Sequence, residues 1–117
     1  MATSRPTVPP KGDPGGAVLG LLGLGLRSRG VVVGVEATRA ALQRGGAAMV
    51  VIARDASERA TEKVVRLAGA RGIPVVGGPT AREIGERLGR PPVMTVAVTD
   101  RHLARGIRAA TTGPDGS

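Results

Sequence analysis

The chain has 117 residues and a formal net charge of +8, and it contains no Cys, Phe, Tyr or Trp. This length suits one domain with a modest core, and the basic excess favours a polyanionic partner, nucleic acid before an anionic membrane. The missing residue types exclude disulfides, thiol nucleophiles and zinc fingers, and they argue against modules that stack bases on aromatic side chains.

Both ends of the chain are poor in residues that build a core. Residues 1–16 contain four of the nine prolines and three glycines, and residues 111–117 are similarly rich in small and turn-forming residues. We therefore predict a disordered lead over 1–16, a folded domain over 17–110 and a flexible tail over 111–117. The longest apolar run, Ala17–Leu26, is too short to span a bilayer and follows no signal-peptide pattern. These features predict a cytoplasmic protein without a membrane partner.

Helical and strand patterns alternate between residues 17 and 110. The continuous apolar run Ala48–Ala53 is typical of a strand covered on both faces, and Val64, Val65 and Leu67 are expected to face the core from a helix. The expected helices are 17–29, 36–44, 57–70, 80–88 and 100–110, and the expected strands are 31–33, 48–53, 73–76 and 93–98. This alternation predicts an α/β fold, a three-layer α/β/α sandwich with a small four-stranded mixed sheet.

Two aspartates follow predicted strands and raise the question of catalysis. Asp55 ends the motif IARD and Asp100 ends AVTD, and ligands of open α/β sheets bind beyond the carboxyl ends of strands. A small metal-assisted or phospho-acceptor enzyme would use such carboxylates. The favoured alternative is helix capping, by Asp55 with Glu58 and by Asp100 for the last helix, while Thr80–Glu83 has the spacing of a capping box. With His102 expected at the surface, the sequence predicts a non-catalytic protein with no metal and no cofactor.

Gly34 lies where the first predicted strand gives way to a helix. A helix start presents backbone N–H groups that suit a phosphate. A turn that requires a positive φ explains the glycine equally well, and both interpretations can hold together. Arg39 follows one turn later, within reach of a phosphate. In a basic chain without aromatic side chains, this pattern predicts a protein that holds folded RNA by its shape.

A stiff proline loop, Arg90-Pro91-Pro92-Val93, comes just before the last predicted strand. If it lies beside Gly34, it offers an apolar ledge to an unstacked base, with Arg90 on a phosphate. The alternative is a plain rigid connector.

Several short motifs occur in one order between about Leu21 and Ile107. They are GLLGLGLRSRG, the Gly34 turn with its helix ending at Arg44-Gly45, VVIARDAS, GIPVV, TAREIGERLG and VAVTD. In this order they resemble the L-seven-Ae type of kink-turn-binding ribosomal proteins, and most closely the bacterial YlxQ-like branch. The resemblance implies an α/β/α sandwich that binds kinked RNA helices as a component of the ribosome or of another ribonucleoprotein.

The resemblance also implies where RNA binds: at the turn and helix start after the first strand, and at the loop before the last strand. The matching residues are Gly34, Val35, Glu36, Ala37, Ala40 and Arg90–Val93, and we add Arg27, Arg29 and Arg39 as expected phosphate contacts. The archaeal and eukaryotic pattern has Asn-Glu and then Lys where this chain has Glu36-Ala37 and Ala40. These departures remove an amide that reads a sheared G·A pair and a lysine that clamps phosphate.

We therefore expect a non-catalytic, monomeric RNA-binding protein that works on the ribosome or in ribonucleoprotein assembly. The main alternative is a protein-interaction module on ribosome or transcription machinery, in which kink-turn binding is lost or weakened. A small enzyme that uses Asp55 or Asp100 is the third and least favoured interpretation.

Overall fold

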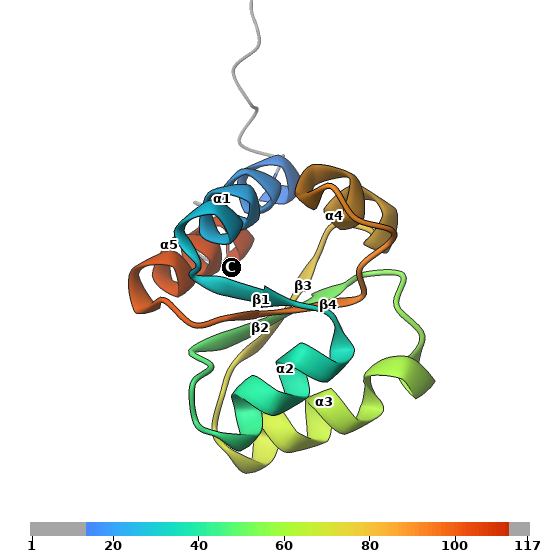
Figure 1. The fold of residues 1–117 in the computed structure, drawn as a ribbon, viewed down its shortest axis with the longest axis vertical. Helices are drawn as coiled ribbons and strands as arrows, with labels where there is room; N and C mark the ends of the chain where they lie inside the picture. The colour runs from blue at the N-terminus through green and yellow to red at the C-terminus, as the bar shows by residue number, and fades with distance from the viewer. Residues whose placement is uncertain (1–13, 113–117) are drawn as a thin grey trace, which may run out of the picture.

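The structure, a computed structural model, describes residues 14–112 (Figure 1). The helices are α1 (Pro14–Ser28), α2 (Val35–Gln43), α3 (Glu58–Ala70), α4 (Ala81–Leu88) and α5 (Arg101–Thr112). The strands are β1 (Val31–Val33), β2 (Met49–Ala53), β3 (Val75–Gly78) and β4 (Thr95–Val98). Helix and strand alternate along the chain, as predicted.

The strands form one sheet in the order β1-β4-β2-β3. β4 is antiparallel to both of its neighbours, whereas β2 and β3 are parallel to each other. It follows that β1, β2 and β3 run in one direction and that β4 runs against them. The predicted four-stranded mixed sheet is confirmed.

Helices cover both faces of the sheet, with α1, α4 and α5 on one face and α2 and α3 on the other (Figure 1). The larger core lies under α1, α4 and α5 and includes Leu22, Ile84 and Ile107. The smaller core, under α2 and α3, includes Leu42 and Val64. All of β4 and nearly all of β2 are buried, which explains their continuous apolar sequences. The predicted three-layer α/β/α sandwich is confirmed.

The third strand differs most from its prediction. The sequence places it at 73–76, but β3 runs on to Gly78, which pairs with Ala53 of β2. A Cβ on Gly78 would press into the Val51 side chain. The glycines that resemble a turn therefore belong to a strand, where they let it approach β2 closely.

The first and the last helix extend beyond their predicted bounds. Residues 14–16 and 111–112, expected in the lead and the tail, belong to α1 and α5; the rest of the predicted lead and tail lies outside the described residues. Val65, expected to face the core, is 45% exposed. Within residues 14–112, no helix is long and apolar enough to cross a membrane.

Candidate nucleic-acid interface

The starts of α2, α3 and α4 gather at one end of the sheet. Since β1, β2 and β3 run in the same direction, the helices that follow them begin at the same end, on the right of Figure 1. β4 runs the other way, so the loop 89–94 that leads into it also lies there. We call this end the Gly34 end and the opposite one the far end.

The start of α2 has no capping side chain among the described residues, because its N-cap residue is Gly34. Gly34 has φ 103° and ψ 161°, a conformation essentially restricted to glycine, so the predicted positive φ is confirmed. A Cβ on Gly34 would meet no atom within 4 Å, which leaves open space beside the turn. The amides of Val35, Glu36 and Ala37 begin the helix at this open end, where the helix dipole favours an anion.

Thr95, the first residue of β4, holds the start of α2 in place. Its carbonyl accepts a hydrogen bond from the Gly34 amide at 2.9 Å, and its hydroxyl donates to the Thr38 hydroxyl at 3.2 Å. Both threonines are fully buried. Thr95 thus fixes α2 through backbone and side chain together. It also joins the end of the loop 89–94 to Gly34, a proximity that the sequence left open.

The loop 89–94 is itself fixed to α4. The Arg90 amide donates to the Gly85 carbonyl at 2.8 Å. Gly85 is buried, and a Cβ on it would overlap the backbone of Pro91. Glycine at position 85 therefore lets the proline loop lie directly on the helix.

The four predicted loop residues do not all face solvent. Arg90, Pro91 and Pro92 are exposed, so they are available to a ligand. Val93 is only 6% exposed, and its amide donates to the Ala81 carbonyl. Val93 therefore belongs to the core and anchors the loop, which corrects its prediction as a contact residue.

Arg39 and Ala40 lie on different sides of α2. Arg39 Nη1 is 3.2 Å from Glu36 Oε1, and with Lys63 and Arg66 the arginine lines a hollow between α2 and α3. Arg39 is thus on the α3 side of the helix. Ala40 is exposed, so this position is accessible to a partner.

Arg27 and Arg29 precede β1 and therefore lie at the far end of the sheet. The three residues of β1, about 10 Å of extended chain, separate them from Gly34. The structure does not bring these two arginines to the predicted phosphate site.

Side chains cap the starts of α3 and α4, whereas no side chain of the described residues caps the start of α2. Ser57 Oγ accepts from the Ala60 amide at 3.1 Å. Thr80 and Glu83 form the predicted capping box: the Thr80 hydroxyl accepts from the Glu83 amide at 3.1 Å, and the Glu83 carboxylate accepts from the Thr80 amide at 2.9 Å. Hydrogen bonds from the Thr80 amide and hydroxyl lower the pKa of the Glu83 carboxyl below its ordinary value of 4.5.

Both aspartates that follow strands cap helices. Asp55 Oδ1 accepts from the Ala81 amide at 2.8 Å, so it caps α4 and not α3 as predicted. Asp100 Oδ1 accepts from the amides of His102 and Leu103 at 2.7 and 3.1 Å, which confirms the predicted cap of α5. Asp55 follows β2 and Asp100 follows β4, so the two lie at opposite ends of the sheet. Within residues 14–112, no group of His, Asp and Glu is placed to hold a metal ion.

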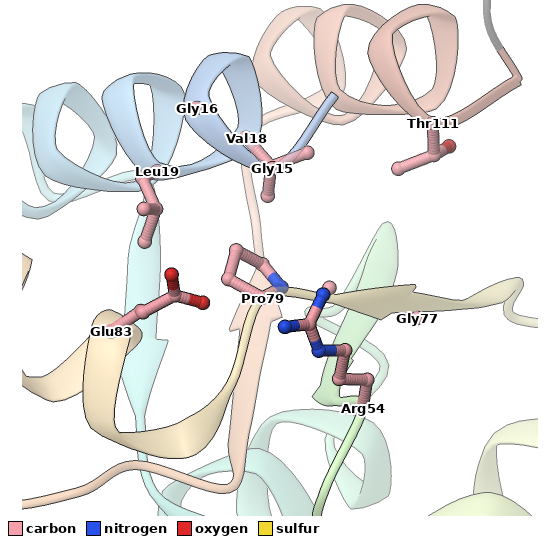
Figure 2. A pocket seen from close by; sticks show the side chains of 10 residues that line it. Gly15, Gly16, Val18, Leu19, Arg54, Gly77, Pro79, Glu83 and Thr111 are labelled. Atoms are coloured by element: carbon pink, nitrogen blue, oxygen red, sulfur yellow. The ribbon is translucent and has the colours of Figure 1, made fainter. Parts of the chain in front are cut away.

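A hollow of about 460 Å³ lies between the start of α1, the end of β3 and the start of α4. The side chains of Arg54 and Glu83 point toward it (Figure 2). Thr80 already engages the Glu83 carboxylate, and beside it the hollow presents the Arg54 side chain and glycine backbone.

These features define a small α/β/α sandwich with an open helix start at one end of its sheet. The chain matches the ribosomal protein L7Ae/L30e/S12e/Gadd45 family over residues 16–107. Since the match spans almost the whole described region, the chain belongs to this family. The family predicted from the motifs is thereby confirmed, while the YlxQ-like branch stays a prediction.

Solved structures share the fold. A protein of unknown function from Bacillus halodurans C is 28% identical, with a TM-score of 0.75, over 80% of this chain and 95% of that one. The Giardia lamblia 15.5kD RNA binding protein is 17% identical, with a TM-score of 0.72, over 89% of this chain and 94% of that one. The comparison with curated proteins found no significant match.

Proposed function

We propose that this protein is a non-catalytic RNA-binding protein that holds a kinked RNA helix between the start of α2 and the loop 89–94, in the ribosome or in another ribonucleoprotein. The contact residues of this proposal are Gly34, Val35, Glu36, Ala37, Ala40, Arg90, Pro91 and Pro92.

The observation that carries the proposal is the open start of α2 beside a fixed loop. The amides after Gly34 have no side-chain cap within residues 14–112 and lie beside the open space at Gly34, and such amides attract an anion. Arg90 adds an exposed positive charge from the loop that leads into β4, and Pro91 and Pro92 add an exposed apolar surface. A site with phosphate-binding amides, a cation and an apolar ledge suits the backbone and an unstacked base of folded RNA.

Two further observations support RNA as the partner. The chain belongs to a family of ribosomal proteins, and one protein with the same fold is an RNA-binding protein. The net charge of +8 favours association with a polyanion and predicts affinity that falls steeply with salt.

The residue at position 40 provides the sharpest test, because Ala40 is exposed in the interior of α2. Lys and Glu have similar helix propensities, so Ala40→Lys and Ala40→Glu should both leave the fold intact. The lysine should tighten binding of a kink-turn RNA by about three- to five-fold, and the glutamate should weaken it by a similar factor.

Matched controls use Ala17, which is exposed on α1, the helix that covers the opposite face of the sheet from α2. Ala17→Lys and Ala17→Glu carry the same charge changes and should alter affinity much less. Filter binding or calorimetry with a kink-turn RNA, and with the same RNA fully paired, measures both pairs. Equal effects at positions 17 and 40 would refute the site, and a wild-type protein that binds neither RNA would leave the protein-interaction module as the function.

A further inference from the structure

A second basic surface lies at the far end of the sheet. The end of α1, the turns after α2 and α3, and the start of α5 meet there, on the left of Figure 1. Together with the outer side of α5 they carry the far-end arginines, which are Arg27, Arg29, Arg44, Arg71, Arg101, Arg105 and Arg108. Asp100 is also at this end, where its carboxylate caps α5.

A groove of about 650 Å³ runs through this surface. One wall is α5, where Arg101, Arg105 and Arg108 recur at i, i+4 and i+7 and so form a row about 10 Å long on one side of the helix. The opposite wall is made of the turns 45–48 and 72–74. The groove therefore sets a row of guanidinium groups against a wall of small residues and backbone, which leaves room for a polyanionic strand.

Helix dipoles account for some far-end arginines but not for those of α5. Arg44 and Arg71 are the C-cap residues of α2 and α3, where a positive charge is favoured. Arg101 lies in the first turn of α5, which has no acidic residue, and there the dipole disfavours a cation. Arg101 and Arg105 are also a like-charged i, i+4 pair, which destabilises a helix. The helix dipole and the repulsion between Arg101 and Arg105 both oppose positive charge at the start of α5. The presence of these arginines there points to an anionic partner.

The first two arginines of the row on α5, Arg101 and Arg105, have no carboxylate partner within residues 14–112. Ion pairs on α2, α3 and α4 join Arg39 to Glu36, Arg66 to Glu62 and Arg82 to Glu86. Within residues 14–112, neither Arg101 nor Arg105 forms an ion pair with a carboxylate, and both are exposed. Their charge is therefore available to a partner.

We infer that the far-end arginines bind the phosphate backbone of an RNA duplex, so that the protein contacts RNA at two opposite ends of its sheet. This inference rests on the proposed function in taking RNA as the partner. Arginine suits this role because its planar fork binds phosphate oxygens in pairs. Contacts to the backbone carry no sequence information, so the Gly34 end selects the kinked element and the far end adds affinity for a neighbouring helix.

The test is the double variant Arg101→Gln/Arg105→Gln with a blunt RNA duplex that has no internal loop. Two lost phosphate contacts should weaken binding about ten-fold or more at low salt and reduce the slope of log K against log salt by about 1.4 to 1.8. The melting temperature should stay the same or rise, because a like-charged pair is removed from α5.

The matched control is Arg59→Gln/Arg87→Gln. Both residues are exposed, on α3 and α4, and neither lines the groove. The control removes the same charge and should lower the salt slope much less. Equal losses in the two variants would show that net charge alone drives duplex binding and would overturn the inference.

The kink-turn RNA separates this inference from the proposed function. If the Ala40 substitutions do not alter kink-turn binding while the Arg101→Gln/Arg105→Gln variant loses duplex binding, the proposed site fails and the far-end surface stands. If the Ala40 substitutions act as expected but the arginine variant binds duplex as tightly as the wild type, the far-end surface fails and the proposed site stands.

Discussion

The starts of α2 and α4 lie at the same end of the sheet but are finished in opposite ways. At α4, Thr80 and Glu83 satisfy each other's backbone amides, and Asp55 reaches across from the end of β2 to satisfy Ala81. At α2, Gly34 contributes no side chain to cap the first amides, and the space beside Gly34 is open. A closed helix start contributes to stability, whereas an open one gives up that contribution and keeps its amides for a ligand. Under the proposed function, the contrast separates residues that stabilise the fold from residues that bind RNA within one layer of loops.

The largest effect is expected from Gly34→Val, which places a side chain at the uncapped start of α2. A β-branched residue at this positive φ should destabilise the fold by about 1–3 kcal/mol. Displacing the α2 amides should also weaken RNA binding about ten- to hundred-fold, the equivalent of one charge-assisted hydrogen bond. Binding is measured at a temperature where circular dichroism shows the variant folded. A folded variant with wild-type affinity would contradict the role of the open start.

The opposite change, at the closed start, should affect stability alone. Thr80→Ala removes the cap of α4 and should lower the free energy of unfolding by about 1 kcal/mol, measured by urea denaturation. The affinity for RNA should not change, because the α4 amides face Thr80 and Asp55 rather than a ligand. Weaker RNA binding by this variant would show that α4 belongs to the interface.

A smaller effect is expected from Glu36, the carboxylate at the open start. Glu36→Gln removes a negative charge beside the proposed phosphate site and releases Arg39 from its ion pair. RNA binding should tighten by about two- to five-fold at low salt, and the gain should shrink as salt is added. Asp55→Asn serves as the control, since Asp55 carries the same charge but caps α4. An equal gain from Asp55→Asn would indicate a general charge effect.

The smallest expected effect is on the pH dependence of stability, through the Glu83 carboxylate that caps the start of α4. The lowered pKa of Glu83 means that its carboxylate stabilises the fold at pH values above its ordinary pKa of 4.5, and that this stabilisation is lost as the pH falls through the lower pKa of the folded state. Melting temperatures of the wild type and of Glu83→Gln should therefore differ most near neutral pH and converge in acid. A difference that stays constant down to acidic pH would contradict this account.

The sequence predicted best what short-range interactions decide. The capping box at Thr80–Glu83 and the positive φ of Gly34 depend on residues within one turn, and both are as predicted. The partner of Asp55 was predicted wrongly, because Ala81 is 26 residues away in sequence and meets it only when β2 and β3 pair. Strand pairing also explains why a glycine pair is part of β3.

The candidate site was likewise predicted only in part. The sequence left open whether the loop 89–94 lies beside Gly34, and the pairing of β1 with β4 brings the two together. It also grouped Arg27 and Arg29 with Gly34, although these arginines precede β1 and Gly34 follows it, so that the strand holds them apart. The row on α5 was missed, although its i, i+4 and i+7 spacing from Arg101 to Arg108 is visible in the sequence. That spacing was the signal for a second basic surface.

Thr95 has a consequence for how RNA binding is driven. Thr95 binds Gly34 and Thr38 and directly follows the loop 89–94. The start of α2 and this loop, the two sides of the proposed site, therefore have a fixed separation before any ligand arrives. Little conformational entropy of the protein is then lost on binding, and most of the ordering cost falls on the RNA. RNAs that already adopt the kinked shape should therefore bind fastest and tightest, and ions that fold the RNA should raise affinity without acting on the protein.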